Sequence, residues 1–266
     1  AISDLNRALE LDPTLVSTRS NLGVAYDTIG EYPKALESLQ QVLEIDPNFK
    51  DAYFNLGAAY YHTAEYKESV AQYDKYLELD RKNEKAYYMR AVAYRSLGQY
   101  ESALADATEA IRINQEYSNV YYERGNIHLF TNEYQKAIKD YGTAIGIDPK
   151  NACALNSRGR SYQLIADYAK AIEDYTAAIQ LDTNFTLPYK NRGNIHYLQQ
   201  EYEDAIQDFS KVLDIEPDNV EALRNRALAH TQLKNYEAAL ADDTRLLELS
   251  PYDSKTWRHR GNIYLA

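Results

Sequence analysis

A strict 34-residue period runs through the chain without insertion or deletion. Six glycines share one grid of this period, at Gly23, Gly57, Gly125, Gly159, Gly193 and Gly261, and Ala91 and Ala227 fill its two remaining points. Seven tyrosines share a second grid, at Tyr32, Tyr66, Tyr100, Tyr134, Tyr168, Tyr202 and Tyr236. A fixed period of this length indicates stacked supersecondary units rather than one globular core. We therefore expect functional surfaces on the faces of a stack.

The period defines seven complete repeats and two partial ones. We number positions in each repeat from the residue predicted to start its first helix: Val16, Lys50, Glu84, Ser118, Ala152, Thr186, Val220 and Ser254. The complete repeats are 16–49, 50–83, 84–117, 118–151, 152–185, 186–219 and 220–253, with half repeats at 1–15 and 254–266. The sequence thus predicts a single array over 1–266. Because residues 1–5 read as the interior of a helix, we expect the chain to be an excerpt of a longer protein.

Each repeat carries the patterns of two helices. Apolar or small residues recur at positions 4, 8 and 11, which is the spacing of one helical face. A second set recurs at positions 20, 24 and 27, as in Tyr141 with Ala144. Proline, which cannot continue a helix, then closes four complete repeats, at Pro47, Pro149, Pro217 and Pro251. The small residues at positions 8 and 20 allow the two helices to approach closely, so an all-α fold is predicted.

This pattern resembles the tetratricopeptide repeat along the whole chain, most closely at NLGVAYDTIGEYPKALESLQQVLEIDP over 21–47. The resemblance implies antiparallel helix pairs stacked into a right-handed superhelical solenoid, with the first helix of each pair lining a concave wall. Two departures stand out. Arg81, Gln115 and Thr183 replace the closing proline, and three histidines replace the aromatic residue at position 11.

Arginine and aspartate occur together at two repeat positions. Position 7 is arginine in the third repeat onward, and position 23 is aspartate in the same complete repeats. The first repeat instead has Leu22 with Ser38, and the second has Leu56 with Gln72. This joint appearance predicts an ion pair inside each of five repeats: Arg90–Asp106, Arg124–Asp140, Arg158–Asp174, Arg192–Asp208 and Arg226–Asp242.

Positions 2, 5, 6, 9 and 13 share the other face of the first helix, with position 12 at its border. We call this face the wall. Its first half is aromatic and its second half is basic, although the chain has a net charge of -11. A cationic surface on an anionic chain favours an acidic or carboxylate-bearing ligand. The predicted peptide-binding residues are Phe54, Tyr88, Tyr122, Arg160, Lys190, Asn194, Arg224, Asn225, Lys255, Arg258 and His259.

Part of the wall resembles a more specific site. Lys190, Asn194, Asn225 and Lys255 look like the two-carboxylate clamp with which chaperone-binding members of this family hold an acidic C-terminal tail. Several charge-assisted donors would hold the carboxylates. His259 stands where the clamp normally has arginine, which removes a permanent bidentate donor. Separately, four position-6 asparagines resemble an interrupted asparagine ladder for a peptide backbone: Asn21, Asn55, Asn191 and Asn225.

Signals for other chemistry are weak. The glycines follow the packing period and form no phosphate-binding loop, and Cys153 has no base nearby in sequence. His128, His196 and His230 lie on different repeats, so we expect no shared metal site, no catalytic residues and no cofactor. The acidic charge disfavours nucleic acid, and no apolar run is long enough for direct membrane insertion. The single cysteine fits a reducing compartment, so a cytoplasmic location is expected.

These observations predict a non-catalytic scaffold that binds a peptide segment of a protein partner in its concave groove. One alternative is a co-chaperone that uses the carboxylate clamp. Another is a structural spacer in a large assembly, such as a ciliary or trafficking complex, or the regulatory arm of an enzyme lying outside this segment. End-to-end stacking with further repeats or another copy is also compatible with the pattern.

Overall fold

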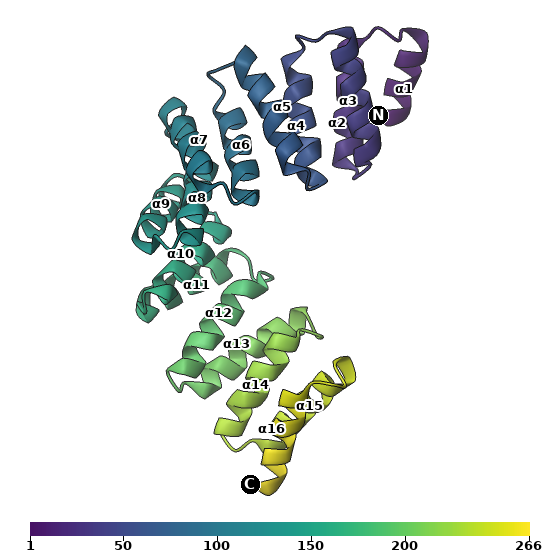
Figure 1. The fold of residues 1–266 in the computed structure, drawn as a ribbon. Coiled ribbons are helices and arrows are strands. Elements are labelled where there is room, and N and C mark those ends of the chain that lie inside the picture. Colours follow the sequence, from purple (N-terminus) through teal and green to yellow (C-terminus); the bar gives the residue numbers. More distant parts are fainter. The chain divides into compact units, whose positions relative to one another are not determined.

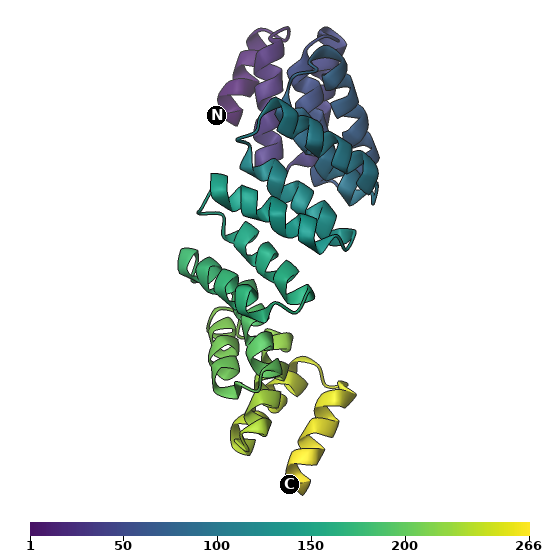
Figure 2. The same cartoon turned by 90° about the vertical axis from the view of Figure 1, so that its left-hand side faces the viewer.

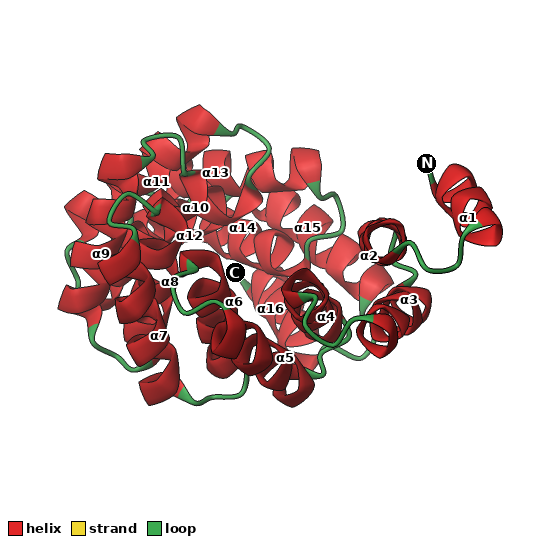
Figure 3. Ribbon diagram, turned by 90° about the horizontal axis from the view of Figure 1, so that it is seen from above, coloured by secondary structure: helices red, strands yellow, loops and turns green.

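The computed structural model describes residues 1–266 and consists of α-helices joined by short loops (Figure 3). The helices are α1 (Ile2–Leu11), α2 (Val16–Thr28), α3 (Tyr32–Ile45), α4 (Lys50–His62), α5 (Tyr66–Leu79), α6 (Glu84–Ser96), α7 (Tyr100–Ile113), α8 (Ser118–Phe130), α9 (Tyr134–Ile147), α10 (Ala152–Leu164), α11 (Tyr168–Leu181), α12 (Thr186–Leu198), α13 (Tyr202–Ile215), α14 (Val220–Gln232), α15 (Tyr236–Leu249) and α16 (Ser254–Leu265). All the predicted first-helix starts are confirmed. None of these helices combines the length and the apolar character that a membrane-spanning segment requires.

The chain divides into two compact units, which we describe separately. The N-terminal unit is Ala1–Glu133 with α1–α8, and the C-terminal unit is Tyr134–Ala266 with α9–α16. Within each unit every helix packs against the next one in chain order, as Figures 1 and 2 show. The boundary falls between α8 and α9, inside the repeat predicted over 118–151. Continuity of the array across this point, and its right-handed twist, stay predictions.

The first helices form an inner row in each unit. In the N-terminal unit α2, α4, α6 and α8 contact one another in succession, and in the C-terminal unit α10, α12 and α14 do the same. The second helices have no comparable contacts with one another. Helices that touch along one side and separate along the other produce a curved stack. The first helices therefore line the inner face of each unit, as the repeat pattern predicts.

The two helices of a repeat meet where position 8 faces position 24. A Cβ added to Gly57 would lie 2.7 Å from Cζ of Tyr73, and one added to Gly159 would lie 2.8 Å from Cε1 of Tyr175. Both rings are fully buried. Glycine is thus required where the second helix supplies a ring, because any Cβ would overlap it. In the third repeat both positions carry alanine, and Ala91 packs in one buried cluster with Ala107.

The turn inside each repeat uses a left-handed residue at position 15. Gly30 and Gly98 have φ of 81° and 73°, and five other repeats place a residue with a side chain there at similar φ: Ala64, Asn132, Ala166, Gln200 and Lys234. In the first repeat the next amide, Glu31 N–H, donates to the Tyr26 carbonyl over 2.9 Å, which is a Schellman-type helix end. Because L-residues rarely adopt this conformation, the alanines are strained there.

In four repeats, a bidentate Arg–Asp ion pair joins the first helix to the second. The guanidinium Nε and Nη2 atoms contact the two aspartate oxygens over 2.6–2.9 Å in Arg90–Asp106, Arg158–Asp174, Arg192–Asp208 and Arg226–Asp242. These four predictions are confirmed. Arg124–Asp140 spans the boundary between the units and stays a prediction.

The arginine also reaches the second helix of the preceding repeat. Nη1 of Arg90 contacts Asp74 over 2.5 Å, Nη1 of Arg192 donates to Thr176 over 2.7 Å, and Nη1 of Arg226 donates to Ser210 over 3.0 Å. One side chain thus joins three helices, and the sequence pattern had indicated only two of them.

The strained turns predict stabilising substitutions. We expect Ala166→Gly to raise the free energy of unfolding by up to about 1 kcal/mol, because it relieves about 1–2 kcal/mol of left-handed strain against roughly 0.5–1 kcal/mol of glycine entropy. Urea denaturation measures the change. Gly98→Ala is the matched control: no atom lies within 4 Å of the added Cβ, so only its φ of 73° opposes the substitution. A rise in stability in both variants would contradict this account.

The ion pairs predict a compensated double mutant. Asp208→Ser should destabilise the protein by about 3 kcal/mol, because it leaves the half-buried charge of Arg192 without its carboxylate. Adding Arg192→Leu should recover most of the loss, since the resulting leucine and serine are the pair that the first repeat uses at Leu22 and Ser38. Thermal or urea unfolding of the variants measures both effects. Strictly additive losses in the double mutant would show that the two side chains do not act as a pair.

Candidate functional site

The wall of the N-terminal unit is aromatic but largely engaged in packing. Phe54 meets the rings of Tyr73 and Tyr76 edge-on, with centroids 5.5 Å apart in both contacts. Tyr88 contacts Tyr117 in the same way at 5.3 Å, and burial raises the pKa of its hydroxyl. Tyr73 and Tyr76 are buried, whereas Phe54 and Tyr88 are half-buried. Their edges can line a surface, but packing inside the repeats also explains why they are aromatic.

A buried ion pair crosses the same wall between α6 and α8. Arg95 donates to the Glu123 carboxylate, which is only 3% exposed. Burial raises the pKa of Glu123, and the Arg95 ion pair opposes that shift. The Arg95 guanidinium also lies 5.8 Å from the ring centroid of Phe130, and Tyr122 is half-buried on the same helix, α8. These two charges of the wall are therefore used within the fold.

In the C-terminal unit, two of the predicted cations bind acids that lie on the following first helix or at its N-cap. Lys190 on α12 contacts Glu221 on α14 over 2.8 Å, and Arg224 on α14 contacts Asp253, just before α16, over 2.8 Å. Arg224 keeps one buried donor, Nε, without a partner. These pairs neutralise part of the charge that the sequence places on this wall.

Three other cations on this wall are exposed and lack a described ion pair: Arg160, Lys255 and Arg258. Two of them, Lys255 and Arg258, line a cavity of about 210 Å³ together with Arg224, Leu228 and Asn262. A second cavity of about 200 Å³ is lined by Asn194, Tyr197, Leu198, Asn225 and Leu228. Leu228 lines both cavities, so most of the predicted basic and amide residues gather around one stretch of α12, α14 and α16.

His259 is held by the protein on both ring nitrogens. Its Nδ1 contacts the Asp243 carboxylate over 2.8 Å, and its Nε2 contacts the Thr231 hydroxyl over 3.1 Å. The Thr231 hydroxyl already donates to the Ala227 carbonyl, so it must accept from Nε2. Neither nitrogen is left for a ligand, although the ring lines the larger cavity. Burial raises the pKa of Asp243, and His259 opposes that shift.

The sequence reasoning missed Asp243, although a signal for it existed. Asp243 lies at position 24, where other repeats place a buried ring such as Tyr175 or Phe209. It is 1% exposed, so a carboxylate at this position needs a partner on an adjacent helix. That partner is the histidine at the clamp position. Thr231, Leu228 and Thr256 carried no comparable signal.

Asparagine side chains link successive first helices along the wall. Asn225 donates to Asn194 over 2.8 Å, and Asn191 donates to the buried Asn156 over 3.1 Å. A longer contact of 3.5 Å joins Asn55 to Ser20. Each amide uses one of its two N–H donors in this way. The second N–H group of Asn225 remains beside the smaller cavity.

Comparisons with known proteins agree with this architecture. Models described as the tetratricopeptide repeat match residues 50–83, 84–117, 118–151 and 154–185, and one described as the TPR repeat matches 28–63 and 193–234. A search of curated proteins gives no match.

Several solved structures share the fold. The structure of MamA has 25% sequence identity and a TM-score of 0.56, and the match covers 61% of this chain and 95% of that one. YrrB, described as a TPR protein with an unusual peptide-binding site, has 22% identity and a TM-score of 0.56 over 71% of this chain and 97% of its own. The pilF protein of Pseudomonas aeruginosa has 18% identity and a TM-score of 0.70 over 80% of this chain and 97% of its own.

Arrays of this repeat are generally protein–protein interaction scaffolds, and the fold is usually non-catalytic. The matched repeats cover most of the chain, and the matches over 50–83, 84–117 and 154–185 coincide with helix pairs described above. The chain therefore belongs to the tetratricopeptide repeat family.

Proposed function

We propose that the C-terminal unit binds an acidic peptide segment of a protein partner against the wall of α12, α14 and α16. The observation that carries this proposal is the state of Lys255 and Arg258. Both are exposed, lack a described ion pair and line one cavity, whereas Lys190 and Arg224 are neutralised by neighbouring acids. Two cations without an ion-pair partner thus line a cavity, although the whole chain has a net charge of -11. This local positive charge favours an anionic partner.

The two adjoining cavities supply the other contacts that a peptide needs. Leu228, which lines both, gives an apolar floor, and Tyr197 and Leu198 extend it. Asn225 offers an N–H group beside the smaller cavity, and an amide can bind a peptide backbone whatever its sequence. This arrangement suits a segment that alternates acidic and apolar side chains. The half-buried aromatic wall of the N-terminal unit gives weaker support for an anchor there.

The carboxylate clamp is the narrower alternative, and its geometry is less favourable. A clamp at Lys190, Asn194, Asn225, Lys255 and His259 needs donors that are free to meet a terminal carboxylate. Lys190 is paired with Glu221, and both nitrogens of His259 are occupied. Acidic side chains along the segment therefore fit this wall better than a free C-terminus does.

Fluorescence anisotropy with a labelled acidic–apolar peptide tests the proposal. We expect Lys255→Glu and Arg258→Glu each to weaken binding about fivefold, on the order of 1 kcal/mol for an exposed ion pair. Binding should also weaken as salt rises, because exposed charges are screened. Lys139→Glu on α9 is the matched control: it makes the same change of net charge on the second helix of another repeat, and it should leave affinity nearly unchanged.

Two outcomes would contradict the proposal. Equal weakening by Lys139→Glu would mean that only overall charge matters. Absence of binding to acidic peptides, with the wild-type protein folded by circular dichroism, would remove the acidic ligand altogether. Amidation of the peptide C-terminus separates the alternatives: unchanged affinity supports binding through side chains, whereas a large loss supports the clamp.

A further inference from the structure

Two repeats place a lysine ammonium at the same corner between their helices. In the first repeat Lys34 contacts the Glu31 carboxylate over 3.1 Å, and its Nζ lies 5.6 Å from the ring centroid of Tyr26. In the fifth repeat Lys170 contacts Asp167 over 2.7 Å and lies 5.3 Å from the Tyr162 centroid. The lysine is at position 19, the acid at 16 and the ring at 11. This corner is therefore a cation-binding position, which we call the corner site. A carboxylate lies on one side of the cation and the face of an aromatic ring on the other.

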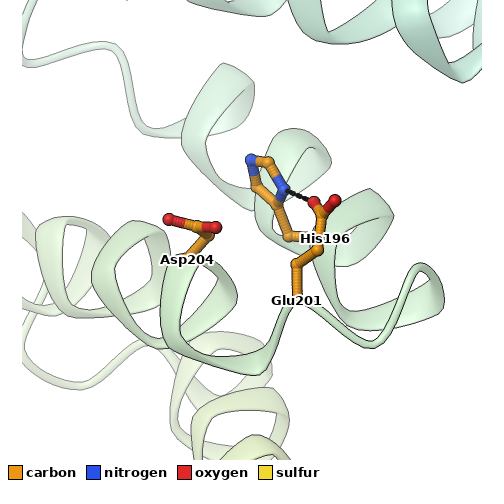
Figure 4. Close-up of side chains that lie close together, drawn as sticks. All are labelled: His196, Glu201 and Asp204. Atoms are coloured by element: carbon orange, nitrogen blue, oxygen red, sulfur yellow. Dashed lines mark hydrogen bonds and ion pairs between the residues drawn. The ribbon is translucent and has the colours of Figure 1, made fainter.

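The sixth repeat keeps the acid at position 16 of the corner site, but it has an acid instead of a lysine at position 19. Asp204 replaces the lysine at position 19, Glu201 holds position 16, and His196 replaces the tyrosine at position 11. Nδ1 of His196 contacts Glu201 over 2.6 Å. One candidate ligand atom from each side chain lies within 4.8 Å of the other two. Figure 4 shows the three side chains close together, with His196 on α12, Glu201 at the N-cap of α13 and Asp204 in the first turn of α13.

We propose that His196, Glu201 and Asp204 bind a divalent transition metal ion, of which Zn²⁺ fits best. One imidazole nitrogen and two carboxylate oxygens are a ligand set that zinc accepts, and water would fill the open position. Calcium and magnesium prefer sites made of oxygen alone. Glu201 and Asp204 are exposed, so their side chains can rotate to shorten the ligand separations toward those of a bound ion.

The first and fifth repeats, which we call the sister repeats, give an independent reason to expect a cation at this corner. The chain itself provides the cation at this corner in the first and fifth repeats, and in the sixth it provides a second carboxylate instead. The second repeat also has two acids at these positions, Glu65 and Glu68, but only the sixth combines them with a histidine at position 11. Arg192, one turn earlier on α12, cannot compensate, because it is bound to Asp208 and Thr176. An external ion would therefore neutralise two neighbouring carboxylates and join the end of α12 to the start of α13.

The fourth repeat shows that a histidine–glutamate contact alone is not the signal. His128 and Glu133 also lie 2.6 Å apart, at the same repeat positions as His196 and Glu201. That repeat carries Lys136 at position 19, so its ligand set lacks the second carboxylate. At positions 11, 16 and 19 the two repeats differ in one residue only, which is Lys136 in the fourth repeat and Asp204 in the sixth. Exchanging this one residue therefore gives a matched test of the proposal.

Isothermal titration calorimetry of the 266-residue protein with ZnCl₂, after treatment with EDTA, tests the site. We expect one zinc ion per chain, and affinity should fall as the pH is lowered, because a ligating imidazole must be neutral. Asp204→Lys restores the lysine of the sister repeats, and His196→Tyr restores their ring. Each should weaken binding at least about tenfold, the scale of losing a strong site contact, while the fold is preserved.

His128→Tyr is the control and should leave zinc affinity unchanged. Zinc should also raise the melting temperature of the wild type and of His128→Tyr, but not that of Asp204→Lys, since an ion that binds only the folded state stabilises it. Equal binding by Asp204→Lys, an equal loss in His128→Tyr, or no binding by the wild type would each overturn the proposal. None of these readouts depends on the peptide proposed above.

Discussion

Close packing between positions 8 and 24 determines the geometry of every other surface in this chain. Where the second helix supplies a ring, as at Tyr73 or Tyr175, the first helix supplies a glycine whose missing Cβ makes room for it. This contact fixes how the first helix is rotated about its axis. Because positions 8 and 11 then face the partner helix, positions 2, 5, 6 and 9 must face away from it. The wall is thus a consequence of the packing.

The same geometry gives different roles to the basic residues at different positions of the repeat. Position 7 lies at the edge of the packed face, where the guanidinium can bind Asp on its own second helix and also reach the preceding repeat. Positions 2 and 5 lie on the inner face, and their cations are either paired with an acid at the next first helix, as in Arg224, or exposed, as in Lys255 and Arg258. The internal pairs are constrained by buried aspartates, whereas the exposed cations can contribute to binding.

Features encoded by the repeat itself could be predicted from the sequence. The helix starts and four of the Arg–Asp pairs follow from residues that recur every 34 positions, so several repeats report the same contact independently. Contacts that do not recur from repeat to repeat could not be predicted from the 34-residue pattern. The contacts of Lys190 with Glu221 and of Arg224 with Asp253 depend on how one first helix is offset from the next. The group of His196, Glu201 and Asp204 was overlooked because the histidines were compared between repeats and not with the acids of their own repeat.

The central claim is that the inner face of the C-terminal unit receives a partner segment. Methyl NMR during titration with an acidic peptide tests it most directly, because Leu228 lines both cavities and Leu240 lies on a second helix, α15. The account predicts that the methyl signals of Leu228 and Leu198 shift in proportion to bound peptide while those of Leu240 stay in place. Shifts at Leu240 with unchanged Leu228 signals would contradict it.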